Sequence, residues 1–291
     1  MTEEEIIPLK LHMTSCATKE EMNANVKASV ERGYTRLNEY LDTQSGRVHL
    51  CGSAPSLRDS WSKIPPGEDV MAINSAIGFM IDQGLPPRWG MIWDASHLCE
   101  KFAVPHADTT YLIGARCHPS VFERLIGCRV IVWHAGGDHN IKEYLGSLGI
   151  NEPMVNGGTA GITRGLYLAY ALGYRDFHLH GADSCYQGDE THVRGSVVPE
   201  KDIRVFHGGR WFRTTPEMCA QIEEIKMIYP SFRNTMGADI TCYGDGMLQH
   251  SVALMKSDEA GALANARLAY EEYRKQYLEQ TSSQPLEGVI A

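Results

Sequence analysis

The segment formed by residues 156–192 constrains the fold more than any other part of the chain. It reads NGGTAGITRGLYLAYALGYRDFHLHGADSCYQGDETH: a glycine-rich turn opens an apolar helix, the helix leads into a short strand, and the strand ends in a polar loop. In parallel α/β proteins this order places helix N–H groups and strand-end side chains at one edge of the sheet, where such folds bind ligands. The segment therefore predicts a ligand site on a parallel sheet and favours an enzyme.

Strands and helices alternate along the chain up to this segment. We expect strands at residues 47–51, 70–73, 90–93, 110–113, 130–133 and 177–180, and helices at 18–42 and 74–84. Alternation of this kind predicts βαβ units. The fold class that follows is α/β: a Rossmann-like, mostly parallel sheet with helices on both faces.

The pattern changes after the polar loop, which predicts a small C-terminal α/β extension. We expect a β-hairpin of residues 204–206 and 210–213, a helix from 216 to about 228 capped by Thr214 or Thr215, a strand at 238–242 and a helix at 257–279. The predicted division is a helical lead-in at 1–46, a catalytic domain at 47–250, and a C-terminal helix and tail at 251–291.

Composition limits the possible partners. Hydrophobic residues make up 43% of the 291 residues, charged residues make up 22%, and the formal net charge is -9. These values are ordinary for a globular protein, and the acidic balance argues against a broad nucleic-acid-binding surface. The eight cysteines form no CxxC pair, which favours free thiols over a zinc site. The sequence predicts no signal peptide, no membrane span and a cytoplasmic location, and it is compatible with an oligomer.

A small-residue turn follows the first strand of the predicted sheet. Gly52, Ser53, Ala54, Pro55 and Ser56 come directly after residues 47–51. Small residues let a ligand approach the backbone, and a serine can hydrogen-bond a phosphate. The turn matches neither GxGxxG nor the P-loop pattern, so an ordinary strand-to-helix turn is the alternative.

Polar residues also end the next two strands. Asn74 and Ser75 end the second strand and would face the same crevice, where Asn74 can contact a base or ribose; helix capping is the alternative. Asp94 ends the third strand, and it can bind a ribose hydroxyl, share a magnesium ion or cap a helix.

The glycine-rich turn and the polar loop supply the remaining candidates. Gly157, Gly158 and Thr159 precede a helix whose free N–H groups attract anions, although a flexible link is the alternative. His192 in the loop can act as a general base, as a neutral imidazole does near pH 7, or it can be a solvated polar residue. In the same segment we assign Asp183 to catalysis and Tyr186 to donor binding.

Basic and histidine side chains complete the set of candidates. Arg194 and Arg213 are the candidate phosphate ligands in a basic cluster that also contains Lys201, Arg204 and Arg210; solvated surface charge is the alternative. His178 and His180 alternate along a strand and share a face. A packed pair is favoured there over metal binding.

Taken together, these blocks resemble the MptE-like family, which includes archaeal 6-hydroxymethylpterin diphosphokinases and motility accessory factors associated with flagellin glycosylation. The resemblance covers roughly residues 47–250. It is carried by GSAPSL, INSAIGFMIDQGLPPRWGMIWD, NGGTAGITRGLYLAYALGYRDFHLHGADSCY, THVRG, GGRWFRTTPEM and NTMGADITCYG, in that order. A fainter similarity reaches bacterial sialyltransferases that use a CMP donor.

The resemblance implies one of two reactions. In the glycosyltransferase-like branch, the Gly52 turn and Asn74 hold the nucleotide of an activated sugar, the Gly157 turn lines its phosphate or sugar, and His192 deprotonates a hydroxyl acceptor. In the diphosphokinase branch, ATP and magnesium are used and a denser acidic cluster is expected. Here Trp93 stands beside Asp94 where a second acid is expected, and THVRG favours sugar transfer.

The sequence therefore predicts a transferase that uses a nucleotide-activated donor, most simply a nucleotide sugar. An ATP- and magnesium-dependent diphosphokinase and a nucleotide-binding protein without turnover are the alternatives. In each case we expect the Gly52 turn and His192 to share one cavity.

Overall fold

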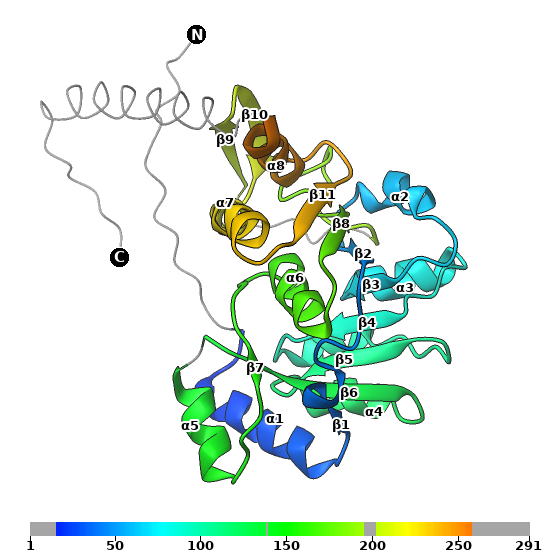
Figure 1. Cartoon of the computed structure of the whole chain (residues 1–291), viewed down its shortest axis with the longest axis vertical. Coiled ribbons are helices and arrows are strands. Elements are labelled where there is room, and N and C mark those ends of the chain that lie inside the picture. Colours follow the sequence, from blue (N-terminus) through cyan, green and yellow to red (C-terminus); the bar gives the residue numbers. More distant parts are fainter. Residues whose placement is uncertain (1–15, 138, 195–201, 258–291) are drawn as a thin grey trace, which may run out of the picture.

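The computed structural model describes residues 16–137, 139–194 and 202–257, and its main feature is one parallel sheet (Figure 1). In the described part of the chain the sheet has nine strands in the order β1-β6-β5-β4-β3-β2-β8-β11, with β7 beside β6, and every neighbouring pair is parallel. The strands are β1 (Thr35–Arg36), β2 (Arg47–Cys51), β3 (Val70–Ile73), β4 (Trp89–Ile92), β5 (Thr110–Gly114), β6 (Arg129–Ala135), β7 (Met154–Val155), β8 (Asp176–His180) and β11 (Asp239–Cys242).

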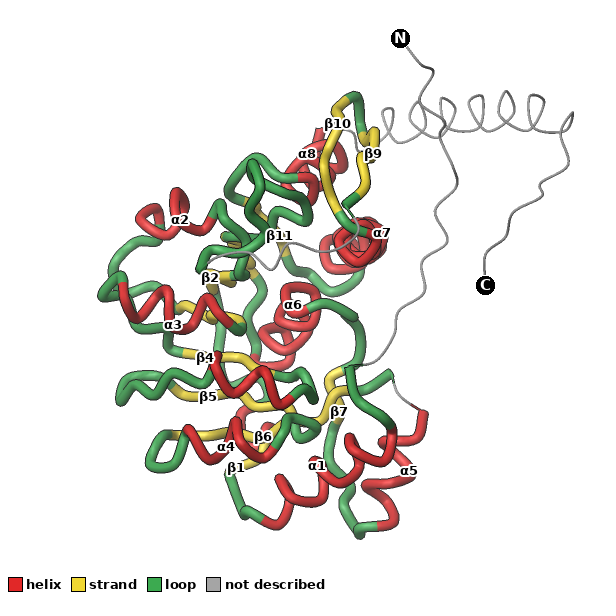
Figure 2. The backbone as a smooth tube through the Cα atoms, turned by 180° about the vertical axis from the view of Figure 1, so that it is seen from behind, coloured by secondary structure: helices red, strands yellow, loops and turns green. Residues whose placement is uncertain are grey.

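Helices cover both faces of the sheet (Figures 1 and 2). They are α1 (Lys19–Glu31), α2 (Leu57–Ser60), α3 (Ser75–Asp82), α4 (Pro119–Arg124), α5 (His139–Ser147), α6 (Gly161–Leu172), α7 (Pro216–Asn234) and α8 (Met247–Ser257), with 3-10 turns η1 (Leu37–Tyr40), η2 (Trp61–Lys63) and η3 (His97–Phe102). Apolar residues of α6, α7 and α8 form one core cluster with the sheet, and those of α1, α3, α4 and α5 form a second. The central strands read as near-continuous apolar runs because both of their faces are buried.

The strand order creates one switch point, between β2 and β8. From β2 the chain adds β3, β4, β5 and β6 in one direction, whereas β8 and β11 extend the sheet in the other. In open α/β sheets, the loops that leave neighbouring strands at such a point diverge and open a crevice for ligands. The two loops here begin at Gly52 and Gly181.

The backbones at Gly52 and Gly181 are in direct contact. Gly52 N donates to His180 O at 2.8 Å, and Ala54 N donates to Gly181 O at 3.0 Å. A Cβ atom on Gly52 would lie 2.4 Å from Gly181 O, and one on Gly181, whose φ is +58°, would lie 2.6 Å from Gly52 O. The approach of the two loops therefore requires glycine at both positions.

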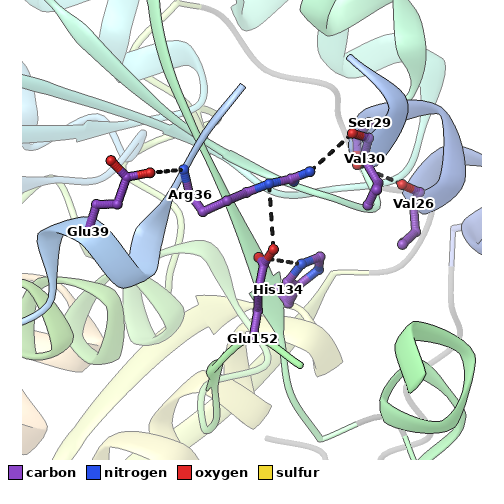
Figure 3. Close-up of polar contacts among 7 residues, drawn as sticks. All are labelled: Val26, Ser29, Val30, Arg36, Glu39, His134 and Glu152. Carbon is purple, nitrogen blue, oxygen red and sulfur yellow. Dashed lines mark hydrogen bonds and ion pairs between the residues drawn. The ribbon is translucent and has the colours of Figure 1, made fainter. Parts of the chain in front are cut away.

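A half-buried polar network ties the N-terminal segment to the sheet (Figure 3). Arg36 of β1 donates to Val30 O at 3.1 Å and lies 3.6 Å from Glu152, and Glu152 contacts the buried His134 of β6 at 3.1 Å. Burial is the main cause that lowers the pKa of His134. Residues of the predicted lead-in at 1–46 thus supply the edge strand β1 of the same sheet.

The predicted α/β class, with a Rossmann-like sheet and helices on both faces, is confirmed. The six strands expected in the sheet all form, with ends that differ by at most two residues from prediction. The hairpin is also confirmed as β9 (Ile203–His207) and β10 (Arg210–Thr214), which pair antiparallel, and Thr215 caps α7 by accepting from Met218 N at 3.3 Å.

Two predicted helices have the wrong length. The helix expected at 18–42 ends at Glu31, because Gly33 takes a left-handed φ of +68° and the chain then enters β1. The helix expected to end near 228 continues through Pro230 to Asn234. Tyr229 and Phe232, on either side of this proline, lie on the buried side of α7 and belong to the core. The helix predicted at 257–279 lies outside the described residues apart from Ser257, the last residue of α8.

We expect Gly52→Ala to lower the free energy of unfolding by about 1–3 kcal/mol, the usual range for forced overpacking, because the new methyl group meets backbone rather than a flexible side chain. Urea unfolding measures the change. Gly146→Ala is the matched control: no atom lies within 4 Å of its Cβ position inside α5, so it should be neutral or stabilising. Equal effects of the two substitutions would contradict the close approach.

Candidate functional site

The loop that carries His192 lies against the Gly52 turn. Val193 N donates to Ser53 O at 2.7 Å, and Ser53 Oγ donates to Ile73 O at the end of β3 at 3.0 Å. Three strand ends, those of β2, β3 and β8, therefore meet at one place on the carboxyl edge of the sheet. The structure brings the Gly52 turn and the loop of His192 together, as the sequence predicts.

Arg58, on α2, clamps this loop from both sides of His192. Its guanidinium pairs with both carboxylate oxygens of Glu190, and it donates to Val193 O through Nη2 at 2.8 Å and through Nε at 3.1 Å. A planar guanidinium with several donors suits such a clamp. Arg58 was not a sequence candidate, because nothing in its local sequence shows that it reaches residues 190–193.

His192 presents an exposed imidazole whose pKa is below its ordinary value. Desolvation of the ring by the protein around it is the main cause of the lowered pKa, and the positive charge of Lys101 is the second. Thr191 Oγ1 lies 2.9 Å from Nδ1. The ring is therefore neutral at pH 7, and its Nε2 is the basic nitrogen when Nδ1–H donates to Thr191.

Asn74 and Ser75 present buried oxygen atoms that no group in the described structure satisfies. Asn74 Oδ1 and Ser75 Oγ are both buried and without a hydrogen-bond partner. Asn74 stands at the N-cap position of α3, but its side chain does not cap the helix, and its φ of 52° is rare for a residue other than glycine. Because buried polar atoms are nearly always paired, these two favour the ligand-binding interpretation over capping.

The start of α6 lies beside Asn74. A Cβ on Gly161 would be 3.1 Å from Ile73 Cγ2 and 3.9 Å from Asn74 Nδ2. Gly161 is the first residue of α6, so helix N–H groups that have no acceptor within the helix lie close to the Asn74 side chain.

The glycine turn before α6 is already occupied by a carboxylate. Glu224 of α7 accepts from Thr159 N at 2.6 Å and from Thr163 Oγ1 at 2.6 Å. Gly157 packs under the Tyr167 ring, and the Cβ position of Gly158 falls on the backbone of α6. This turn therefore closes on the protein itself, and its candidate anion site holds an internal anion.

Asp183 anchors the Gly52 turn rather than facing an open cavity. The carboxylate is fully buried and accepts from Ser56 N at 3.0 Å, from Ser56 Oγ and from Gln249 Nε2 at 2.9 Å. Burial is the main cause that raises its pKa, and these hydrogen bonds oppose the rise. Pro55 and Ser56 are buried with it, so the geometry favours structural roles for all three.

Asp94 lies on the same sheet edge, at the end of β4. Its Oδ1 accepts from Ser96 N at 3.0 Å and from Cys16 Sγ at 2.6 Å. Among the residues that the structure describes, no group of three or more His, Cys, Asp or Glu side chains is placed to hold a metal ion. A magnesium ion at Asp94 would therefore depend on one carboxylate and on the phosphates of a substrate.

The two arginines proposed as phosphate ligands are paired with acidic side chains. Arg194 pairs with Asp82 of α3, and Arg213 pairs with Asp189 and Asp202. Arg213 also lies 4.5 Å from the centre of the Tyr186 ring, whose buried hydroxyl has no partner in the described structure.

Three buried histidines lie together between β2 and β8. His49 Nδ1 is 3.0 Å from His180 Nε2, the His180 ring stacks on Tyr243 at 4.3 Å, and His178 Nδ1 is 2.9 Å from the Tyr243 hydroxyl. Burial is the main cause that lowers their pKa values, to about 4 for His49 and about 3 for His180. His178 and His180 pack on one face, as predicted.

The state of the cysteines and the apolar character of the helices can also be compared with the sequence. All eight cysteines are free. None of the helices in the described ranges has both the length and the apolar character needed to cross a membrane.

The sheet, its switch point and the glycine-opened helix define a Rossmann-like α/β protein whose candidate site lies at the carboxyl edge of the sheet. Residues 20–189 match the family model described as 6-hydroxymethylpterin diphosphokinase MptE-like, and the chain belongs to this MptE-like family. The family inferred from the motif blocks is therefore confirmed; the match ends at residue 189, before the last three of the six blocks. No match was found among curated protein sequences.

Solved structures support the fold. The MAf glycosyltransferase from Magnetospirillum magneticum AMB-1 is 18% identical, with a TM-score of 0.58, over 78% of this chain and 36% of that one. This chain thus spans about a third of that protein's length. A mammalian sialyltransferase, 11% identical over 79% of this chain and 86% of that one, has a TM-score of 0.39, which is too low to carry an argument.

We expect the free energy of unfolding to fall as the pH drops from 6.5 towards 4. In that window an unfolded histidine binds a proton, whereas His49 and His180 stay neutral in the fold. Each contributes up to about 1.4 kcal/mol per pH unit. Urea unfolding of His180→Phe, which keeps a ring on Tyr243, should show a shallower slope. His106→Phe, at the opposite edge of the sheet, should keep the wild-type slope, and an unchanged slope in His180→Phe would contradict the assignment.

Proposed function

We propose that this protein transfers a glycosyl group from a nucleotide-activated donor to a hydroxyl acceptor. One arrangement carries the proposal. The loop holds the neutral imidazole of His192 beside the Gly52 turn, and Ser53 of that turn bonds the end of β3, which is followed by Asn74 and Ser75. The side-chain oxygens of Asn74 and Ser75 have no partner in the described structure. Membership of a transferase-like family and a fold shared with a glycosyltransferase support it.

In this proposal Asn74 and Ser75 hold the nucleoside part of the donor. The Asn74 amide oxygen accepts a hydrogen bond from a ribose hydroxyl or a base N–H, and Ser75 Oγ bonds a second polar atom. A ligand that pairs both atoms removes the desolvation penalty that the free protein carries. The strained backbone at Asn74 is consistent with a functional position, because such strain is concentrated at binding sites.

His192 then acts as the general base. Nε2 takes the proton of the acceptor hydroxyl while the hydroxyl oxygen forms a bond to the anomeric carbon of the sugar. The bond from that carbon to the donor phosphate oxygen breaks, and the nucleotide leaves with the electron pair. Thr191 and the Arg58 clamp orient the ring without touching the reacting atoms.

A 6-hydroxymethylpterin diphosphokinase reaction is the second candidate, because the family description names that activity. It predicts ATP- and magnesium-dependent formation of AMP. The single strand-end carboxylate of Asp94 and the absence of a three-residue metal group in the described part of the chain favour the first candidate.

We expect His192→Ala to lower kcat by about 10²–10⁴-fold with little change in donor affinity, as loss of a general base does. Steady-state kinetics with the identified donor measures it. His106→Ala, a loop histidine at the amino edge of the sheet, is the control and should keep full activity. Unchanged turnover in His192→Ala removes this residue from the mechanism.

The pH profile separates a base from a structural residue. Because the pKa of His192 is below 6.5, activity should hold through neutral pH and fall only at lower pH, where the ring is protonated. Lys101→Met removes a charge that lowers this pKa, so the acid limb of kcat/KM should move to higher pH. An acid limb that stays in place would show that His192 is not the titrating group.

The donor can be identified by thermal shift with CMP, UDP, GDP and ADP compounds, with and without magnesium. A ligand at 100 times its Kd stabilises the fold by about 2.7 kcal/mol. Ser75→Ala should weaken binding of the matching nucleotide about tenfold without loss of stability, because Ser75 Oγ has no partner within the described protein. In contrast, Ser60→Ala should lower stability and spare binding, since Ser60 Oγ donates to Ser56 O. No shift with any nucleotide would contradict the proposed function.

A further inference from the structure

Two guanidinium groups lie against one indole ring on the carboxyl edge of the sheet. Trp93 follows β4, Arg116 follows β5, and Arg164 is in the first turn of α6. The Arg116 Cζ atom is 5.3 Å from the centre of the Trp93 ring, and the Arg164 Cζ atom is 4.8 Å from it. The two guanidinium carbons therefore cannot be further apart than the sum of these distances.

Within the described residues, neither guanidinium forms an ion pair with an acidic side chain. In the described ranges no ion pair is formed by Arg116 or Arg164, and the Nε atoms of both are buried without a hydrogen-bond partner. Arg164 is only 5% exposed, and its Nη1 donates to Val155 O at 2.7 Å and to Gly136 O at 3.3 Å. A charge this deeply buried is normally paired with an anionic group.

The electrostatics point the same way. Burial first, and then the charge of Arg116, lower the pKa of Arg164 to about 10, so Arg164 remains positive at neutral pH. Glu224 opposes this shift, but its carboxylate is held by Thr159 N and Thr163 Oγ1 at the start of α6. The repulsion between two like charges is relieved when an anion binds near both.

The phosphate donors expected from the sequence are already engaged. Gly52 N and Ala54 N donate to backbone carbonyls of β8 and its loop, and Thr159 N donates to Glu224. Arg194 and Arg213 are bound to aspartates. Trp93, against which both arginines lie, follows β4, the strand next to Asn74, whose N–H donates to Met91 O of β4 at 3.0 Å.

We propose that Arg116 and Arg164, placed against Trp93, form the subsite that binds the phosphate groups of the substrate. Guanidinium groups suit this task because they offer paired N–H donors to phosphate oxygens. Only the identity of the molecule that carries the phosphates rests on the proposed function. One feature of the sequence indicates this site: Arg164 is the single charged residue within the apolar helix Gly161–Leu172.

The test is binding of inorganic pyrophosphate to the full chain at low salt, measured by calorimetry. Arg116→Gln should weaken affinity about tenfold or more, the loss expected for a charged hydrogen-bonding group. Arg129→Gln removes the same charge at the amino end of β6 and should leave affinity unchanged. No pyrophosphate binding by the wild type, or equal weakening in both variants, would overturn the subsite.

Two further measurements separate the phosphate subsite from a purely structural role. Arg164→Lys keeps the charge but loses the guanidinium fork, so pyrophosphate affinity should fall while the thermal midpoint shows that the chain still folds. Pyrophosphate should also change tryptophan fluorescence in the wild type and not in Trp93→Phe. Normal affinity in folded Arg164→Lys would show that Arg164 only ties α6 to β6 and β7. Malonate serves as a control anion. If malonate displaces pyrophosphate as effectively as inorganic phosphate does, the assignment to phosphate is overturned.

Failure of this subsite is distinguishable from failure of the proposed function. If pyrophosphate binding depends on Arg116 but no nucleotide sugar is turned over, the subsite stands and the glycosyl donor is wrong. If turnover depends on His192 but Arg116→Gln binds pyrophosphate normally, the function stands and the phosphate subsite is wrong.

Discussion

The contact between the Gly52 and Gly181 backbones is the constraint on which the rest of the site depends. It joins the first residues after β2 and β8 at the only reversal of strand order in the described sheet. Asp183, two residues further on, fixes Ser56, so the two loops are also linked by a buried carboxylate. The 190–193 segment can then lie on Ser53, whose side chain bonds Ile73 at the end of β3.

Near this edge, buried histidines are neutral, whereas two arginines form no ion pair within the described residues. The histidines at positions 49 and 180 stay uncharged, which lets strands β2 and β8 pack closely without a counter-ion. At the ends of β4 and β5, Arg116 and Arg164 lie against Trp93, and neither forms an ion pair within the described residues.

The sheet and the position of its active edge were predictable, because both depend on local pattern. Alternating strands and helices predict the fold, and the loops after β2, β3 and β8 must share an edge of a parallel sheet. What each side chain contacts was less predictable. Arg194 and Arg213 read as free cations, yet distant aspartates pair with them, and Asp183 reads as reactive, yet it bonds Ser56 and Gln249. Such pairings span many residues, and no local spacing encodes them.

The contact of Glu224 with the start of α6 has a consequence for how binding preferences can change. The partial positive charge of a helix N-terminus is a property of the peptide backbone, and a substitution cannot remove it. Here an internal carboxylate already neutralises that charge. Attraction of further anions to this edge therefore depends on side chains. A single codon change alters a side chain, so relatives with the same backbone can diverge in the charge of the molecules they accept.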